Sequence, residues 1–149
     1  NISTPLIFHL LKYLPGIKDM LFMLQLEVVE RMAALPNSKS YGRLSIMVQY
    51  FCRVEKLFNV PPSAFSPAPK VESAIVKLTP HDLAPDELAT PDDLTNLLRQ
   101  AFAHRRKTLR NNLSSLISAD ELESLNINPG LRPENLSLDD YVRICKHLQ

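Results

Sequence analysis

Residues 20–26, Met-Leu-Phe-Met-Leu-Gln-Leu, form a short and nearly unbroken apolar run. Such a run favours a strand buried on both faces, as in a parallel sheet, because a strand with one solvent face alternates apolar and polar residues. Helices are predicted on either side of it, over residues 5–14 and 28–35. A parallel strand needs neighbours, and the chain starts at Asn1 rather than at a methionine. We therefore expect that an N-terminal part of the protein precedes this sequence.

Two further strands are predicted around a proline-rich loop. Residues 54–60 and 71–78 favour strands, and the second of them alternates in polarity. Between them, residues 60–70 read Val-Pro-Pro-Ser-Ala-Phe-Ser-Pro-Ala-Pro-Lys, and the four prolines restrict several φ angles. We expect a stiff and ordered loop rather than a flexible linker. Residues 43–52 are compatible with either a helix or a strand.

The polarity of the chain changes at residues 79–93, which are acidic, rich in proline and typical of a domain boundary. After them neither Pro nor Gly appears until Pro129, so the rest is predicted to be helical, with breaks near residues 104–105 and 114–118. The predicted fold class is α/β followed by a small all-α domain. Its domains are residues 1–80, a linker over 81–91 and a helical domain over 92–149.

The composition is that of an ordinary globular protein. Of 149 residues, 45% are hydrophobic and 22% charged, which excludes wholesale disorder. No apolar run approaches the roughly 18–20 residues that cross a bilayer, so no membrane association is expected. Cys52 and Cys145 are predicted to be packed, reduced thiols of a cytoplasmic protein. The four histidines lack ligand spacing, so no metal site is predicted.

The charges are unevenly distributed, although the net charge is only +1. Between residues 94 and 119 the chain has no acidic residue, and a local basic patch favours contact with a polyanion. On an ideal helix Arg99, Arg106 and Arg110 would lie within roughly 40° of one another. An ordinary solvated helix face is the alternative. The basic residues of this segment are Arg99, Arg105, Arg106, Lys107 and Arg110.

Several stretches together resemble one family. Asn1-Ile2-Ser3 resembles the end of an N-L-P-Y-N-I-S motif, and further matches are Met23-Leu24-Gln25, Glu27-Val28, Arg31, residues 41–45 (Tyr-Gly-Arg-Leu-Ser), the loop and strand over residues 60–76, the segment AFAHRRKTLRNNL over 101–113, and residues 132–137. The set resembles the ribosomal RNA adenine dimethyltransferases, the KsgA family. The proline loop and the basic segment are its most specific parts.

The resemblance implies a Rossmann-like, S-adenosylmethionine-dependent methyltransferase domain, of which this chain is the C-terminal part, followed by a helical rRNA-binding domain. Family members dimethylate N6 of two adjacent adenines in small-subunit rRNA during ribosome biogenesis. The partner implied is the immature small ribosomal subunit, and the complete protein is expected to be a monomer. A cofactor loop rich in glycine is absent from this sequence, which has three isolated glycines. The cofactor site is therefore expected in the missing N-terminal half, and this chain alone is expected to be inactive.

The resemblance also suggests roles for single residues. Phe65 is predicted to stack on the target adenine, because an extruded base needs a flat surface; packing into the core is the alternative. Arg43 and Lys70 are further candidates for RNA contact, and each is equally compatible with a solvated or ion-paired side chain. The main candidates for RNA binding are Arg105, Arg106, Lys107 and Arg110.

Two other functions stay open from the residues. One is a methyltransferase of the macrolide-resistance type, which acts on large-subunit rRNA. The other is a non-catalytic rRNA-binding or ribosome-assembly module, because no cofactor loop is visible. Without a first half, the strand over residues 20–26 is expected to expose an apolar edge, which favours aggregation.

Overall fold

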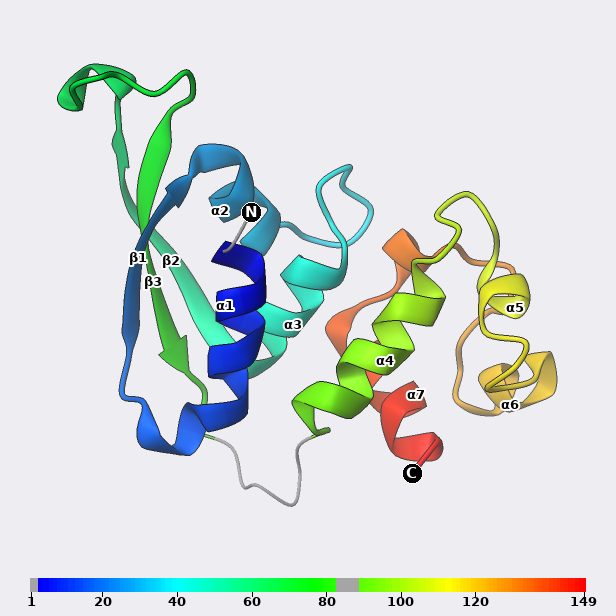
Figure 1. Ribbon diagram of the computed structural model, residues 1–149. Coiled ribbons are helices and arrows are strands. Elements are labelled where there is room, and N and C mark those ends of the chain that lie inside the picture. Colours follow the sequence, from blue (N-terminus) through cyan, green and yellow to red (C-terminus); the bar gives the residue numbers. More distant parts are fainter. Residues whose placement is uncertain (1–2, 83–88) are drawn as a thin grey trace.

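A computed structural model describes residues 3–82 and 89–149 (Figure 1). The predicted linker over residues 81–91 falls largely outside the described residues, as does Asn1. With η marking a 3-10 helix, the elements are α1 (Ser3–Leu10), η1 (Leu11–Gly16), β1 (Met20–Gln25), α2 (Leu26–Met32), α3 (Arg43–Phe51), β2 (Cys52–Val60), η2 (Pro62–Ala64), β3 (Ser73–Pro80), α4 (Pro91–Ala101), α5 (Leu109–Asn112), α6 (Ala119–Ser124), η4 (Pro133–Asn135) and α7 (Leu138–His147).

The three strands form one antiparallel sheet in the order β1-β3-β2. β1 pairs with β3 from Met20 opposite Leu78 to Gln25 opposite Ser73. β2 pairs with the other side of β3, with one irregularity between Lys56 and Phe58. The predicted alternation of β3 is confirmed, because Ala74, Val76 and Leu78 are buried and the residues between them are half-buried.

The prediction that residues 20–26 form a parallel strand buried on both faces is wrong for this structure. β1 is antiparallel, and although Met20 and Leu24 are buried, Leu21 and Met23 are 62% and 51% exposed. Successive side chains of a strand point to opposite faces, and no described helix covers the outer face. An apolar run indicates which residues favour burial, but it does not show whether a second layer is present.

Helices α1–α3 lie on one face of the sheet, and α4–α7 pack beyond them (Figure 1). One continuous core runs through these layers, from Val76 in β3 through Met47 in α3 to Leu98 in α4 and Ile144 in α7. Residues 43–51, whose sequence is compatible with either a helix or a strand, form the helix α3. This helix packs against both β2 and α4, and its buried side chains belong to the common core. Below, residues 3–80 are called the sheet region and residues 89–149 the helical region.

The helical region is built from short helices with strong local start signals. The Thr90, Ser118 and Ser137 side chains each accept a hydrogen bond from the backbone N–H three residues on, which satisfies a donor that the helix leaves free. The two predicted breaks are confirmed: α4 ends at Ala101, and a second break separates α5 from α6.

Both cysteines are buried and free, which confirms the prediction of packed thiols. Burial raises the pKa of the Cys52 thiol to about 12 and, with a smaller contribution from the negative charge of Asp93, that of Cys145 to about 11. Neither thiol is therefore an activated nucleophile. No helix within the described residues is long and apolar enough to cross a membrane.

Candidate functional site

The basic segment of the sequence forms a turn between α4 and α5. Residues 102–108, the basic turn, are not helical, so Arg99 and Arg106 do not share a helix face with Arg110. The estimate of a common face within 40° is therefore wrong, because α4 already ends at Ala101, where the Phe102 N–H closes the last turn on the Leu98 carbonyl.

Three cations of this segment project into solvent. Arg106 and Lys107 on the basic turn and Arg110 on α5 are all exposed. Over the described residues none of the three takes part in an ion pair. Unpaired cations on a short turn and on the helix that follows it attract an anionic partner, and Arg in particular forms bidentate contacts with phosphate.

Arg105 behaves differently from its neighbours, because its guanidinium reaches across to the sheet region. It donates to the backbone carbonyl of Tyr41 at 2.5 Å and to that of Lys39 at 3.3 Å. The same guanidinium lies over the Phe102 ring, 5.7 Å from its centroid. These contacts hold the loop before α3 against the basic turn.

A cleft of about 590 Å³ opens where this loop meets α1 and α2. Four of its five charged lining residues are basic, so the cleft, here called the cationic cleft, carries a clear positive excess. Arg31 pairs with Glu27 at 3.0 Å, whereas Lys39 and Arg43 form no ion pair within the described part of the chain. The charged lining residues are Glu27, Arg31, Lys39, Arg43 and Arg105.

The buried hydroxyl of Ser45 fixes the rim of the cationic cleft. Its Oγ accepts a hydrogen bond from the Gly42 N–H at 3.1 Å and donates to the Arg31 carbonyl at 2.5 Å. The first contact caps α3, which begins at Arg43. The second ties the start of α3 to the end of α2. These hydrogen bonds connect the backbone segments that carry Arg31 and Arg43, so these two cations of the cleft do not lie on independent loops.

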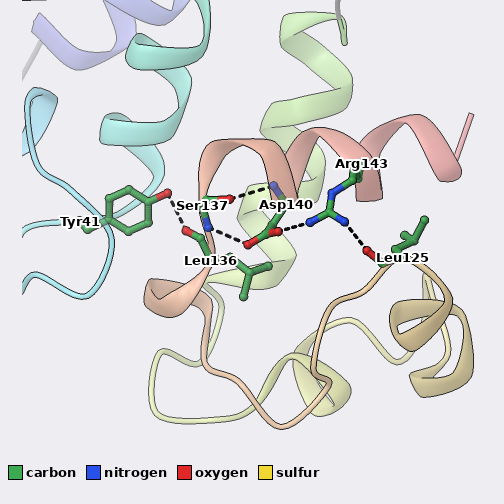
Figure 2. Close-up of polar contacts among 6 residues, drawn as sticks. All are labelled: Tyr41, Leu125, Leu136, Ser137, Asp140 and Arg143. Atoms are coloured by element: carbon green, nitrogen blue, oxygen red, sulfur yellow. Dashed lines mark hydrogen bonds and ion pairs between the residues drawn. The ribbon is translucent and has the colours of Figure 1, made fainter.

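A buried tyrosine joins the sheet region to the helical region (Figure 2), because the Tyr41 hydroxyl donates to the Leu136 carbonyl at 2.8 Å. Within the helical region, the buried Tyr141 hydroxyl donates to the Pro133 carbonyl at 2.6 Å. Burial, with a contribution from Asp140, raises the pKa of both phenols well above the ordinary value of 10.0, so both remain protonated donors.

The segment after Leu136 is itself braced. Ser137 and Asp140 form a capping box at the start of α7, and Asp140 also pairs with Arg143, which donates to the Leu125 carbonyl (Figure 2). The partner of Tyr41 is therefore held by α7 and by the end of α6.

A second link lies at the tip of the loop before α3. The Asn37 N–H donates to the Glu134 carbonyl at 2.8 Å, and the Asn135 amide donates to the Asn37 side-chain oxygen at 2.9 Å. Asn37 has a φ of 71°, a conformation that Asn adopts more readily than most residues. Residues 132–137, one of the stretches that carry the sequence resemblance, thus form the segment that contacts this loop.

The proline loop projects from the end of the β2–β3 hairpin (Figure 1). Phe65 is half-buried there and does not belong to the hydrophobic core of the described residues, and Lys70 is exposed. The Ser66–Pro67 peptide bond is cis. Neither Phe65 nor Lys70 lines the cationic cleft, but in Figure 1 the proline loop, the loop before α3 and the basic turn lie on one side of the molecule.

Together these features suit the binding of an extended anion better than self-contained catalysis. No group of three or more His, Cys, Asp or Glu within the described residues is placed to hold a metal ion. Of the residues that line the cationic cleft, Arg43 and Arg105 were predicted from the sequence as candidates for RNA contact, whereas Lys39 was not. The sequence around Lys39 gave little indication of a site because Lys39 is an isolated lysine before Tyr41-Gly42. Only the folded structure places it beside α1 and α2 at the cationic cleft.

Comparison with known proteins gives a consistent result. Residues 1–149 match the family described as Ribosomal RNA adenine dimethylase. The chain is 57% identical over 148 residues to Ribosomal RNA small subunit methyltransferase A of Hahella chejuensis, covering 99% of this chain and 54% of that protein. The proteins of the same name from Legionella pneumophila and Pseudomonas aeruginosa are 55% and 57% identical over equally long matches. The chain spans about half the length of these curated relatives.

Solved structures agree. A dimethyladenosine transferase from Plasmodium falciparum superposes with a TM-score of 0.81 at 34% identity, covering 96% of this chain and 61% of that one. The 23S rRNA methyltransferase ErmE superposes with a TM-score of 0.65 at 19% identity, covering 99% and 61%, which shows a shared fold alone.

Proposed function

The chain belongs to the ribosomal RNA adenine dimethylase family, and on that premise we propose that the complete protein dimethylates N6 of two adjacent adenines in small-subunit rRNA, with S-adenosylmethionine as methyl donor. Relatives at 55–57% identity are named for the small subunit, whereas the large-subunit enzyme shares only the fold at 19% identity. These observations support the small-subunit substrate over the macrolide-resistance type. The names of these relatives also support a methyltransferase over a purely non-catalytic assembly module.

The residues of this chain do not fit the cofactor. The glycines stand alone at positions 16, 42 and 130, so no glycine-rich loop is present. The cationic cleft is also unsuitable, because its surplus of Arg and Lys repels the positively charged sulfonium of S-adenosylmethionine. We place the cofactor site outside residues 1–149.

The same reasoning leads us to propose the larger architecture. Residues 1–80 supply the last strands of a Rossmann-like methyltransferase sheet, residues 81–91 are the linker and residues 92–149 form the rRNA-binding domain. The exposed apolar face of β1 supports this proposal, because such a face favours cover by further protein. Since its proposed substrate is the immature small ribosomal subunit, we place the protein in the cytoplasm, acting as a monomer.

Within this scheme Phe65 is the residue of this chain that meets the target. A base inside a stack cannot reach a buried methyl donor and must be extruded. A half-buried aromatic ring on a proline-stiffened loop, outside the core, offers a stacking surface worth roughly 1–3 kcal/mol. Stacking holds the weakly nucleophilic N6 in line with the methyl group, so orientation supplies part of the rate.

The unpaired cations carry the RNA-docking role. Arg106, Lys107 and Arg110 would neutralise backbone phosphates at the basic turn, and Arg43 would do so in the cationic cleft, with Lys70 as an outer contact. Arg105 contributes positive charge to the cleft while its hydrogen bonds hold Lys39 and Tyr41 in place. The observation that supports this role most directly is the absence of ion pairs at the basic turn within the described residues.

Charge reversal tests the docking role. We expect Arg106→Glu or Lys107→Glu to weaken binding of the complete protein to the small ribosomal subunit severalfold. Each change should also reduce the slope of log affinity against log salt by at least about one, because one phosphate contact is lost. Lys146→Glu is the matched control, since Lys146 is an exposed lysine at the far end of α7. An unchanged salt slope in both variants, or an equal loss in the control, would reject the role.

A further inference from the structure

A second hollow, of about 450 Å³, lies beside the basic turn and shares no lining residue with the cationic cleft. It is bounded by the end of α4, by α5 and by the residues that follow α5. We call it the amide recess. Its polar lining residues include Gln100, His104, Lys107, Asn111, Asn112 and Ser115.

The chemistry of the amide recess differs from that of the cleft. No carboxylate lines it, and Lys107 is its single formal cation. Side-chain amides present a donor and an acceptor side by side, which matches the edges of nucleobases. A bare phosphate would favour several cations, and an apolar ligand would favour an apolar wall. The volume lies within the range of pockets that hold small organic ligands.

Two amides of the recess have hydrogen-bonding capacity to spare. The Ser115 hydroxyl donates to Gln100 Oε1 at 3.1 Å, which orients this amide and leaves its NH₂ group without an acceptor in the described part of the chain. The Asn111 side chain likewise forms no hydrogen bond with any described residue, and only its backbone N–H donates, to the Thr108 carbonyl at 3.1 Å. A ligand can bind to such polar groups without breaking a hydrogen bond within the described part of the protein.

The wall that carries these groups is held in place. Asn112 Nδ2 donates to the His104 carbonyl at 2.9 Å and to the Lys107 carbonyl at 3.3 Å. The Lys107 N–H donates to the same His104 carbonyl at 2.9 Å. The basic turn is therefore closed upon α5, and the position of Lys107 relative to Asn111 is set before any ligand binds, which lowers the entropic cost of binding.

We propose that the amide recess holds the base of one unpaired RNA nucleotide while Lys107 contacts an adjacent phosphate. The proposal rests on the RNA-docking function proposed above. Lys107 belongs to the basic turn and also lines the amide recess. An RNA strand that crosses the basic turn therefore passes the opening of the recess. Amides read the hydrogen-bonding edges of bases, and in RNA these edges are free only where the strand is unpaired. The recess therefore adds base selectivity to a surface whose other contacts go to the backbone.

Fluorescence anisotropy on the complete protein tests this assignment with four labelled probes: 12-nucleotide oligo(A), oligo(C) and oligo(U), and an RNA hairpin. We expect the wild type to bind its preferred homopolymer about tenfold more tightly than the weakest, the scale of one good amide–base pairing. In Gln100→Ala/Asn111→Ala this difference should fall to within about twofold, with an unchanged salt slope. Circular dichroism establishes that the variant is folded. If the double variant is not folded, Asn111→Asp is the second test. This substitution replaces the side-chain donors by acceptors at constant size and should change the order of preference among the homopolymers.

Arg106→Ala is the matched control, because Arg106 lies on the same turn and does not line the recess. It should weaken binding of all four probes alike and lower the salt slope by about one. Equal wild-type affinities for the homopolymers, or a folded double variant that keeps the selectivity, would overturn the recess proposal while leaving RNA docking intact. Failure of every probe to bind, or binding independent of salt, would overturn both.

Discussion

The sheet region and the helical region differ in how completely each buries its apolar residues. In the helical region Leu94, Leu98, Leu109, Leu113 and Ile144 are all fully buried, and Thr or Ser side chains cap α4, α6 and α7. The sheet region buries one face of its sheet and leaves Leu21, Met23 and Phe58 more than half exposed on its strands. The apolar side chains of the helices are thus mostly buried by other residues of this chain, whereas one face of the sheet leaves large apolar side chains exposed.

A leucine-to-alanine substitution is made once in each region, and we expect the two variants to differ strongly in their free energy of unfolding. Leu98→Ala removes a buried side chain from α4 and should lower the free energy of unfolding by about 2–5 kcal/mol. Leu21→Ala in the polypeptide of residues 1–149 should change it by less than about 0.5 kcal/mol, because the side chain is exposed. Urea denaturation of both variants measures the difference.

The same two substitutions in the complete protein test whether further protein covers the outer face of the sheet. If further strands and helices cover the outer face of the sheet, as we propose, Leu21→Ala should there cost about 2 kcal/mol or more. A cost below 0.5 kcal/mol in the complete protein would contradict that architecture. Equal costs at Leu21 and Leu98 in residues 1–149 would contradict the contrast between the regions.

Phe65→Ala probes what the sheet region contributes to the reaction. Loss of the stacking surface should lower the methylation rate of the complete protein by about tenfold or more, since stacking is worth roughly 1–3 kcal/mol. Cofactor affinity should stay the same, because the proposed cofactor site lies elsewhere. Methylation of small subunits and calorimetric titration with S-adenosylmethionine give the two values. A parallel fall in both, or a loss of folding, would assign Phe65 to packing instead.

Tyr41→Phe weakens the junction between the two regions. It removes the donor for the buried Leu136 carbonyl and should cost about 1–3 kcal/mol. Tyr13→Phe is a suitable control, because Tyr13 is exposed. Thermal unfolding should show the Tyr41 variant melting earlier than the control. Identical melting would mean that the Leu136 carbonyl finds an equally good donor without the Tyr41 hydroxyl, and would contradict a stabilising role for this contact.

The smallest expected effect is a dependence on pH within the helical region. A hydrogen bond from His147, aided by Ser118, lowers the pKa of Glu121 below its ordinary value of 4.5. A carboxyl with a lowered pKa stabilises the fold above the ordinary pKa, and this contribution is lost as pH falls through the lowered value. Glu121→Gln should therefore show less loss of thermal stability than wild type below pH 4.5. Superimposable acid profiles would contradict this.

Features with local causes could be predicted from the sequence, and those with distant causes could not. Ser137, followed by Asp139 and Asp140, was sufficient to place the start of α7, and the alternation of β3 identified its buried face. The antiparallel pairing of β1 depends on β3, some fifty residues away. The contact of Arg105 with the Tyr41 carbonyl spans 64 positions, so its bridging position could not be read from the basic segment.

The candidate site likewise has features that could be predicted from the sequence and features that could not. The resemblance was confirmed at the level of the family, and it directed attention to Phe65 and the basic turn. The RNA contacts of Arg43, Lys70 and the basic turn stay predictions. The cationic cleft and the amide recess emerged only when segments distant in sequence were brought together.

The most direct test of the account is a map of where small-subunit rRNA contacts the protein. Ultraviolet cross-linking of the complete protein to the small ribosomal subunit, followed by mass spectrometry, identifies the peptides that carry RNA. We expect adducts within residues 102–111 and within residues 39–43. Adducts confined to α6 and α7, with none at these two segments, would contradict it.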